Sequence, residues 1–119
     1  MKVLVVDDDY AVLDAIRDVL EDEGYEVSLA ANGIEALKQL RRGKPPCVIL
    51  LDLMMPVMNG WEFRREQLRD ETLAAIPTII VTAHSRADES TEELLAAGCI
   101  RKPAQPDELL ATIRGYCHC

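Results

Sequence analysis

The fold of this chain is decided by the stretch Val48-Ile49-Leu50-Leu51-Asp52-Leu53-Met54-Met55-Pro56-Val57-Met58-Asn59-Gly60. Its first four residues are aliphatic without alternation, which is typical of a strand covered on both faces. The run then reaches Asp52 and breaks into a loop that carries Pro56 and Gly60. The pattern predicts that the Asp52 carboxylate stands at the carboxyl end of a central strand, where open α/β sheets bind their ligands.

A second aliphatic run ends in acidic residues in the same way. Residues 3–6 are followed by Asp7 and Asp8, whose side chains would lie beside Asp52 if the two strands are parallel neighbours. Carboxylates at close range repel one another, and a hard divalent cation with oxygen ligands relieves that repulsion. The three aspartates therefore predict a Mg2+ site at this edge of the sheet.

Strand patterns and helix patterns alternate along the whole chain. The predicted strands are residues 2–6, 25–30, 47–51 and 78–81 and a short strand around Ile100. The predicted helices are residues 10–23, the stripe of Ile34, Leu37 and Leu40 after Asn32, residues 61–68, residues 86–97, and a last helix opened by Pro106. This alternation predicts an α/β fold of the doubly wound, flavodoxin-like kind, with a five-stranded parallel sheet of order 2-1-3-4-5 and five helices.

The predicted strand order brings two more polar side chains to the acidic edge. Thr82 ends the fourth strand, and Lys102 follows the fifth. An ammonium group and a hydroxyl group suit a phosphoryl group, the first as a point charge and the second as a hydrogen-bond donor. Together with a metal-binding cluster of carboxylates, they predict phosphoryl-transfer chemistry.

Composition and charge exclude several other classes of protein. A formal net charge of −8 argues against binding to nucleic acid, because phosphate backbones are bound through Lys and Arg. No apolar stretch reaches the roughly 20 residues that span a bilayer, and the N-terminus has no signal-peptide profile, so we expect a cytoplasmic protein without membrane insertion. The length predicts one domain, residues 1–119. Since the cytosol keeps thiols reduced, we expect the four cysteines to be unpaired.

Four motifs of this chain resemble those of the receiver domains of two-component response regulators. They are Val5-Val6-Asp7-Asp8-Asp9, the stretch from Asp52 to Gly60, Thr82-Ala83 and Lys102-Pro103. The likeness covers nearly the whole chain, and the motifs follow one another in the family's order. It implies a signalling domain that catalyses only its own phosphorylation and dephosphorylation, rather than an enzyme with a separate substrate.

The resemblance also implies a role for each site residue. Asp52 would be the phosphoacceptor, a carboxylate nucleophile that takes the phosphoryl group of a phosphohistidine. Mg2+ would be held by Asp52, by Asp8 directly, by Asp7 mainly through a bound water, and by the backbone carbonyl of Met54. Lys102 would pair with the phosphoryl oxygens, and Thr82 would move to hydrogen-bond one of them.

The partners implied are those of the receiver family. A histidine kinase or a phosphotransfer protein would supply the phosphoryl group, and the domain would be a monomer or a dimer that depends on phosphorylation. We expect a downstream protein to bind the face formed by the predicted helix 86–97, the strand around Ile100 and the last helix. His84 is expected either to tune the lifetime of the phosphoryl group or to be an ordinary loop residue.

One departure from the family keeps an alternative open. Cys99 stands three positions before Lys102, where receivers usually carry an aromatic residue. The alternative is a pseudo-receiver that binds partners without phosphorylation. A phosphatase with an aspartyl nucleophile is disfavoured because Met54 stands where its second aspartate is needed, and flavin binding is disfavoured because the aspartates after the first strand would repel a phosphate.

Overall fold

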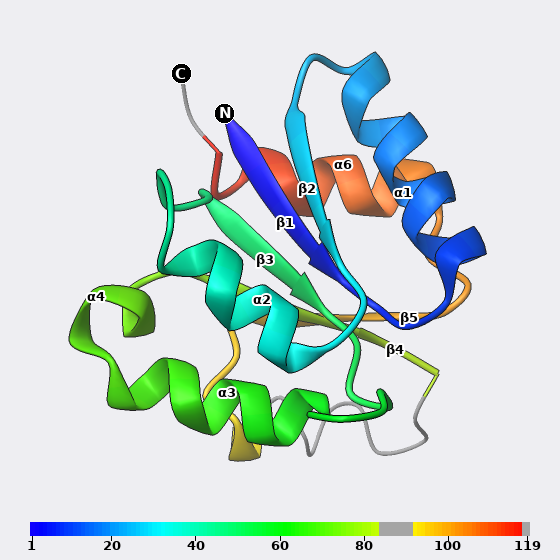
Figure 1. Ribbon diagram of the computed structural model, residues 1–119. Helices are drawn as coiled ribbons and strands as arrows, with labels where there is room; N and C mark the ends of the chain where they lie inside the picture. Colours follow the sequence, from blue (N-terminus) through cyan, green and yellow to red (C-terminus); the bar gives the residue numbers. More distant parts are fainter. Residues whose placement is uncertain (84–91, 118–119) are drawn as a thin grey trace.

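A five-stranded parallel sheet forms the centre of the domain, as seen in a computed structural model that describes residues 1–83 and 92–117. The strands are β1 (Lys2–Val6), β2 (Glu26–Ala30), β3 (Val48–Leu51), β4 (Thr78–Thr82) and β5 (Gly98–Arg101). They lie in the order β2-β1-β3-β4-β5 (Figure 1). The predicted fold class and strand order are therefore confirmed.

Helices cover both faces of this sheet (Figure 1). They are α1 (Tyr10–Asp22), α2 (Gly33–Leu40), α3 (Gly60–Arg69), α4 (Glu71–Ala74) and α6 (Pro106–Arg114). Side chains of α1 and α6 pack on one face, and side chains of α2, α3 and α4 pack on the other. The sheet thus separates two aliphatic cores.

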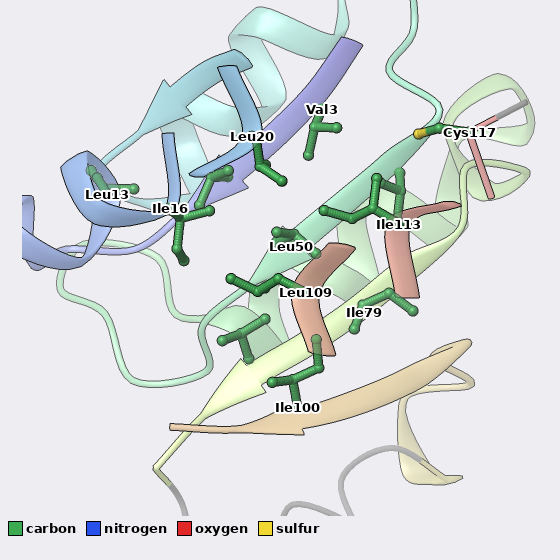
Figure 2. Packing of buried hydrophobic residues seen from close by; sticks show 13 residues of the cluster. Val3, Leu13, Ile16, Leu20, Leu50, Ile79, Ile100, Leu109, Ile113 and Cys117 are labelled. Atoms are coloured by element: carbon green, nitrogen blue, oxygen red, sulfur yellow. The ribbon is translucent and has the colours of Figure 1, made fainter. Parts of the chain in front are cut away.

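Each strand contributes alternate side chains to the two cores, because successive side chains of a strand point to opposite faces of the sheet. In β1, Val3 and Val5 belong to the core under α1 and α6, whereas Leu4 and Val6 belong to the core under α2 and α3. Figure 2 shows the first core, in which Leu50 of the central strand lies among side chains from α1 and α6. Such two-sided burial explains the continuous aliphatic runs in the sequence.

Polar residues fix the points where helices begin. The Asp9 side chain accepts a hydrogen bond from the N–H of Ala11 (2.9 Å) and thereby caps the start of α1. Asn59 and Glu62 form a reciprocal capping box at the start of α3. This box fixes where α3 begins after the loop that follows Asp52.

Two parts of the predicted helix pattern differ from the structure. The short helix α4 was not predicted; its four residues contribute one buried apolar side chain, Leu73, which is too little for a periodic pattern. Of the predicted helix 86–97, residues 86–91 lie outside the described residues, as does His84. Glu92 and Glu93 are helical, and Leu94 and Leu95 form a turn.

The prediction that all the cysteines are unpaired is wrong for two of them. Cys47 and Cys117 form a disulfide with a Cα–Cα distance of 5.3 Å. The chain after α6 returns to the edge where β3 begins, and the N–H of Cys117 donates to the Ile113 carbonyl (2.8 Å). Cys99 is a free, half-buried thiol. The two bridged residues are 70 positions apart, so only the folded chain reveals their proximity.

The described helices are all too short or too polar to cross a bilayer.

Candidate functional site

Three aspartates meet at the carboxyl edge of the sheet. Carboxylate oxygens of Asp7, Asp8 and Asp52 all lie within 4.8 Å of one another. The register explains this, because β1 and β3 pair in parallel with Val6 opposite Leu51 and the N–H of Asp52 donates to the Val6 carbonyl (2.9 Å). Asp7 and Asp52 are buried, at 2% and 5% exposure, whereas Asp8 is exposed. The cluster therefore opens to solvent on the side of Asp8.

Lys102 reaches the same cluster from the end of β5. Its Nζ lies 2.6 Å from Oδ2 of Asp7 and 3.5 Å from Oδ2 of Asp52. The backbone N–H of Lys102 donates to the Thr82 carbonyl (3.1 Å), which holds the residue at the ends of β4 and β5. One ammonium group thus joins two buried carboxylates, of which Asp7 directly follows β1 and Asp52 directly follows β3.

Burial and charge shift the pKa values of this pair. Burial raises the pKa of Asp52, and the nearby Asp7 carboxylate raises it further, while Lys102 and the Met54 N–H oppose the shift. Burial by itself lowers the pKa of Lys102, but the hydrogen bond to Asp7 and the charges of Asp52 and Asp7 together raise it above its usual value. The raised pKa keeps Lys102 protonated and positively charged. Burial disfavours the ionised form of Asp52.

Thr82 and Met54 complete the predicted site in different ways. Thr82 is fully buried at the end of β4, on the same edge as the aspartates. Met54 lies in the loop after β3 with a side chain that is 60% exposed, and its N–H makes a long contact of 3.5 Å with Oδ1 of Asp52. The structure thus brings Asp7, Asp8, Asp52 and Lys102 into direct proximity and places Met54 at the rim.

The loop after Asp52 is held by a close contact between its two ends. The N–H of Gly60 donates to the Leu53 carbonyl (3.0 Å). A Cβ atom at Gly60 would lie 2.5 Å from the carbonyl oxygen of Asp52 and 2.7 Å from Cα of Leu53, so only glycine fits there. The first residue of α3 is therefore in contact with the backbone of Asp52.

The donor set of the cluster suits a hard divalent cation. Three carboxylates supply oxygen ligands, which Mg2+ prefers, and an exposed side leaves room for the waters that Mg2+ usually keeps. Lys102 compensates one of the three negative charges when all are ionised, which leaves two for a divalent ion. The residues present therefore fit the ion that the sequence predicts.

A parallel sheet with this strand order and an acidic edge facing a lysine defines the receiver class of α/β domain. The family model of the response regulator receiver domain matches residues 3–114. The chain therefore belongs to the response regulator receiver domain family, as its motifs predicted.

Individual relatives support this assignment. The chain is 40% identical over 116 residues to the response regulator MprA of Mycobacterium leprae, covering 96% of this chain and 50% of that protein. It is also 40% identical to an uncharacterized 14.6 kDa protein of Leptolyngbya boryana, covering 98% of this chain and 90% of that one. The chain thus spans half the length of the MprA relative but nearly all of the second protein.

Solved structures agree in fold. The chemotaxis response regulator CheY4 of Vibrio cholerae superposes with a TM-score of 0.87 at 32% identity, covering 98% of both chains. A CheY-like receiver domain of Methanospirillum hungatei gives a TM-score of 0.85 at 32% identity, covering 96% of this chain and 90% of that one.

Proposed function

We propose that this domain is a Mg2+-dependent phosphoacceptor switch of a two-component system, with Asp52 as the acceptor. The observation that carries the proposal is the position of the Asp52 carboxylate, which lies with two other aspartates within 4.8 Å and has its Oδ2 3.5 Å from the Lys102 ammonium. In the proposed reaction a carboxylate oxygen of Asp52 attacks the phosphorus of a phosphohistidine on a histidine kinase or phosphotransfer protein. The P–N bond breaks, and the imidazole leaves with the electron pair.

The other site residues act by positioning and by charge. Asp7, Asp8, Asp52 and the Met54 carbonyl would hold Mg2+, which supplies charge neutralisation on the phosphoryl oxygens. Lys102 pairs with a phosphoryl oxygen from the opposite side, and Thr82 donates a hydrogen bond to another. The domain thereby catalyses only its own phosphorylation and dephosphorylation.

The proposal extends to the setting of the domain. Residues 1–119 act as one receiver domain in the cytoplasm, as a monomer or a phosphorylation-dependent dimer. The downstream partner binds β5, α6 and the segment between Thr82 and Gly98. The negative charge of the phosphoryl group at Asp52 changes the interactions at the ends of the neighbouring strands, and this face lies next to them. Nucleic acid is not a direct partner of a domain with net charge −8.

A small-molecule acyl phosphate tests the acceptor. Incubation with this donor and Mg2+ is expected to give a hydroxylamine-labile adduct of one phosphoryl group, located at Asp52 by mass spectrometry. The Asp52→Asn variant is expected to give none. An adduct that persists in this variant, or no adduct in the wild type, would contradict the proposal.

A pseudo-receiver that binds partners without phosphorylation is the second candidate. The observation that favours it is Cys99, a half-buried thiol packed beside Leu53, Ile80 and Leu94 where the family usually carries an aromatic side chain. In this case the partner would bind the wild type and the Asp52→Asn variant equally, with or without the acyl phosphate.

A further inference from the structure

A buried arginine on α3 holds the turn that precedes β5. Arg64 is only 5% exposed. Its guanidinium donates hydrogen bonds to two successive backbone carbonyls, from Nε to that of Leu94 and from Nη2 to that of Leu95, each at 2.9 Å. Such a planar fork fixes the direction as well as the distance of the groups that it binds. The turn is therefore tied to α3 in one orientation.

The rest of the guanidinium is anchored in a buried polar network. Its Nη1 donates to Gln67 Oε1 (2.8 Å) and Thr78 Oγ1 (3.3 Å), and Gln67 Nε2 donates to the carbonyls of Leu73 and Ile76. Among the described residues no carboxylate lies within ion-pair distance of Arg64, and burial lowers its pKa. Each of the three guanidinium nitrogens donates at least one hydrogen bond, so the side chain is held rigidly between α3, β4 and the turn.

The turn has an unfavourable backbone angle, and the strand after it is held mainly by its backbone pairing with β4 from Gly98 to Arg101. Leu95 has a φ of 55°, an unfavourable conformation for a leucine, and its side chain is 71% exposed. β5 has four residues, of which only Ile100 is buried. A short strand with so few buried side chains specifies its own register weakly. A fixed turn before β5 therefore adds to the pairing with β4 in setting this register.

The two ends of β5 lead to the turn and to the site. Lys102 follows β5 directly, and a shift of one residue along a strand moves a side chain by about 3.3 Å. Arg64 lies one helical turn after Gly60, whose backbone abuts Asp52. The same helix therefore contacts the acceptor at its start and holds the turn before β5 with Arg64.

We propose that Arg64 is a positioning residue for the phosphoryl chemistry: by holding the Leu94–Leu95 turn it fixes the register of β5, and so the place of the Lys102 ammonium beside Asp7 and Asp52. This role rests on the proposed function of Asp52. The position of β5 itself does not, so the two can be tested separately.

The kinetic test compares Arg64→Met and Arg64→Lys with Arg65→Met, the exposed neighbouring arginine on the same helix. At saturating Mg2+, the rate of adduct formation with the acyl phosphate is expected to fall by about tenfold to a hundredfold in Arg64→Met, the cost of an ångström-scale displacement of a charged group. Arg64→Lys is expected to be intermediate, and Arg65→Met unchanged. Mg2+ affinity, measured by calorimetry, is expected to stay within about twofold because the aspartates are not displaced.

A double-mutant cycle separates positioning from general damage to the fold. In a Lys102→Ala background, Arg64→Met is expected to slow adduct formation by less than about twofold, since its effect passes through Lys102. An equal slowing in both backgrounds, or a rate in Arg64→Met equal to that of Arg65→Met, would overturn the proposal.

Amide hydrogen exchange reads the strand without any phosphorylation. Residues 98–102 are expected to exchange faster in Arg64→Met than in Arg65→Met, and unchanged protection there would overturn the proposal. If the wild type forms no adduct, the proposed function fails, while exchange at these amides still decides whether Arg64 fixes β5.

Discussion

The two edges of the sheet are built by different means. At the carboxyl edge, three aspartates and Lys102 are held together by charge, and Asp8 is open to solvent. At the amino edge, where β3 and β4 begin, a disulfide joins Cys47 to Cys117 and uncharged acceptors surround the buried Arg64. Charge at the first edge responds to pH, metal and phosphoryl groups, whereas covalent and hydrogen bonds at the second do not. We therefore expect the disulfide to act mainly on stability and the charged cluster mainly on chemistry, with Arg64 as the proposed link from the amino edge to the site.

Reduction of the disulfide should give the largest change in stability. A bond that closes a loop with a sequence separation of 70 stabilises a fold by about 4 kcal/mol through the entropy of the unfolded chain. Urea unfolding of the wild type with and without a phosphine reductant is expected to show a loss of this size, with the rate of adduct formation at 25 °C unchanged.

A Cys47→Ala, Cys117→Ala double variant is the control, since its unfolding should not respond to the reductant. Cys99→Ala, which removes a free thiol of the described residues, should behave like the wild type. Equal free energies of unfolding for the oxidised and reduced wild type would contradict this prediction.

Lys102→Ala should show the opposite separation at the carboxyl edge. Loss of one preorganised charge that meets the phosphoryl oxygens is expected to slow adduct formation by about 10²–10³-fold. The free energy of unfolding should change by less than about 1 kcal/mol with Mg2+ present, because the ion still compensates the aspartates. Paired measurements of the labelling rate and of urea unfolding check both parts. Full-rate labelling would remove Lys102 from the reaction.

The smallest expected effect is the pH dependence that Asp52 confers. Its pKa is raised in the folded state, so the folded protein binds more protons over the interval between the unfolded and folded values. The free energy of unfolding contributed by this group therefore falls as the pH rises through that interval, and the full cost is present above it. Asp52→Asn removes the cost, so without Mg2+ the variant is expected to be about 1 kcal/mol more stable at pH 7.

This advantage should disappear below about pH 3, where the carboxyl is protonated in both states. Asp14→Asn, on the exposed face of α1, should change stability little at either pH. Excess Mg2+ is expected to stabilise the wild type more than Asp52→Asn, because the ion binds the ionised carboxylate. A variant that is less stable than the wild type at pH 7 without Mg2+ would mean that Lys102 outweighs the burial of Asp52.

Local patterns made most of the fold and the acidic edge predictable. Aliphatic runs that end in Asp7 and Asp52 specify both the strands and the edge at which they stop, since a parallel sheet aligns its carboxyl ends. Arg64 was not predicted, because a charged residue on a helix indicates a solvated face. The cue that remained was its place in the buried stripe with Phe63 and Gln67. The disulfide depends on a contact between distant segments, which no local pattern carries.

The alternation of β1 between the two cores has a consequence for the site. Because Val3 and Val5 face one core and Leu4 and Val6 face the other, a single-residue deletion in this strand would exchange the faces of every residue before it. The same deletion would also move the residues before it by about 3.3 Å along the strand relative to Asp7. The length of β1 therefore has two effects. The same number of residues that packs its side chains into both cores also places the Asp7 carboxylate at the carboxyl edge of the sheet.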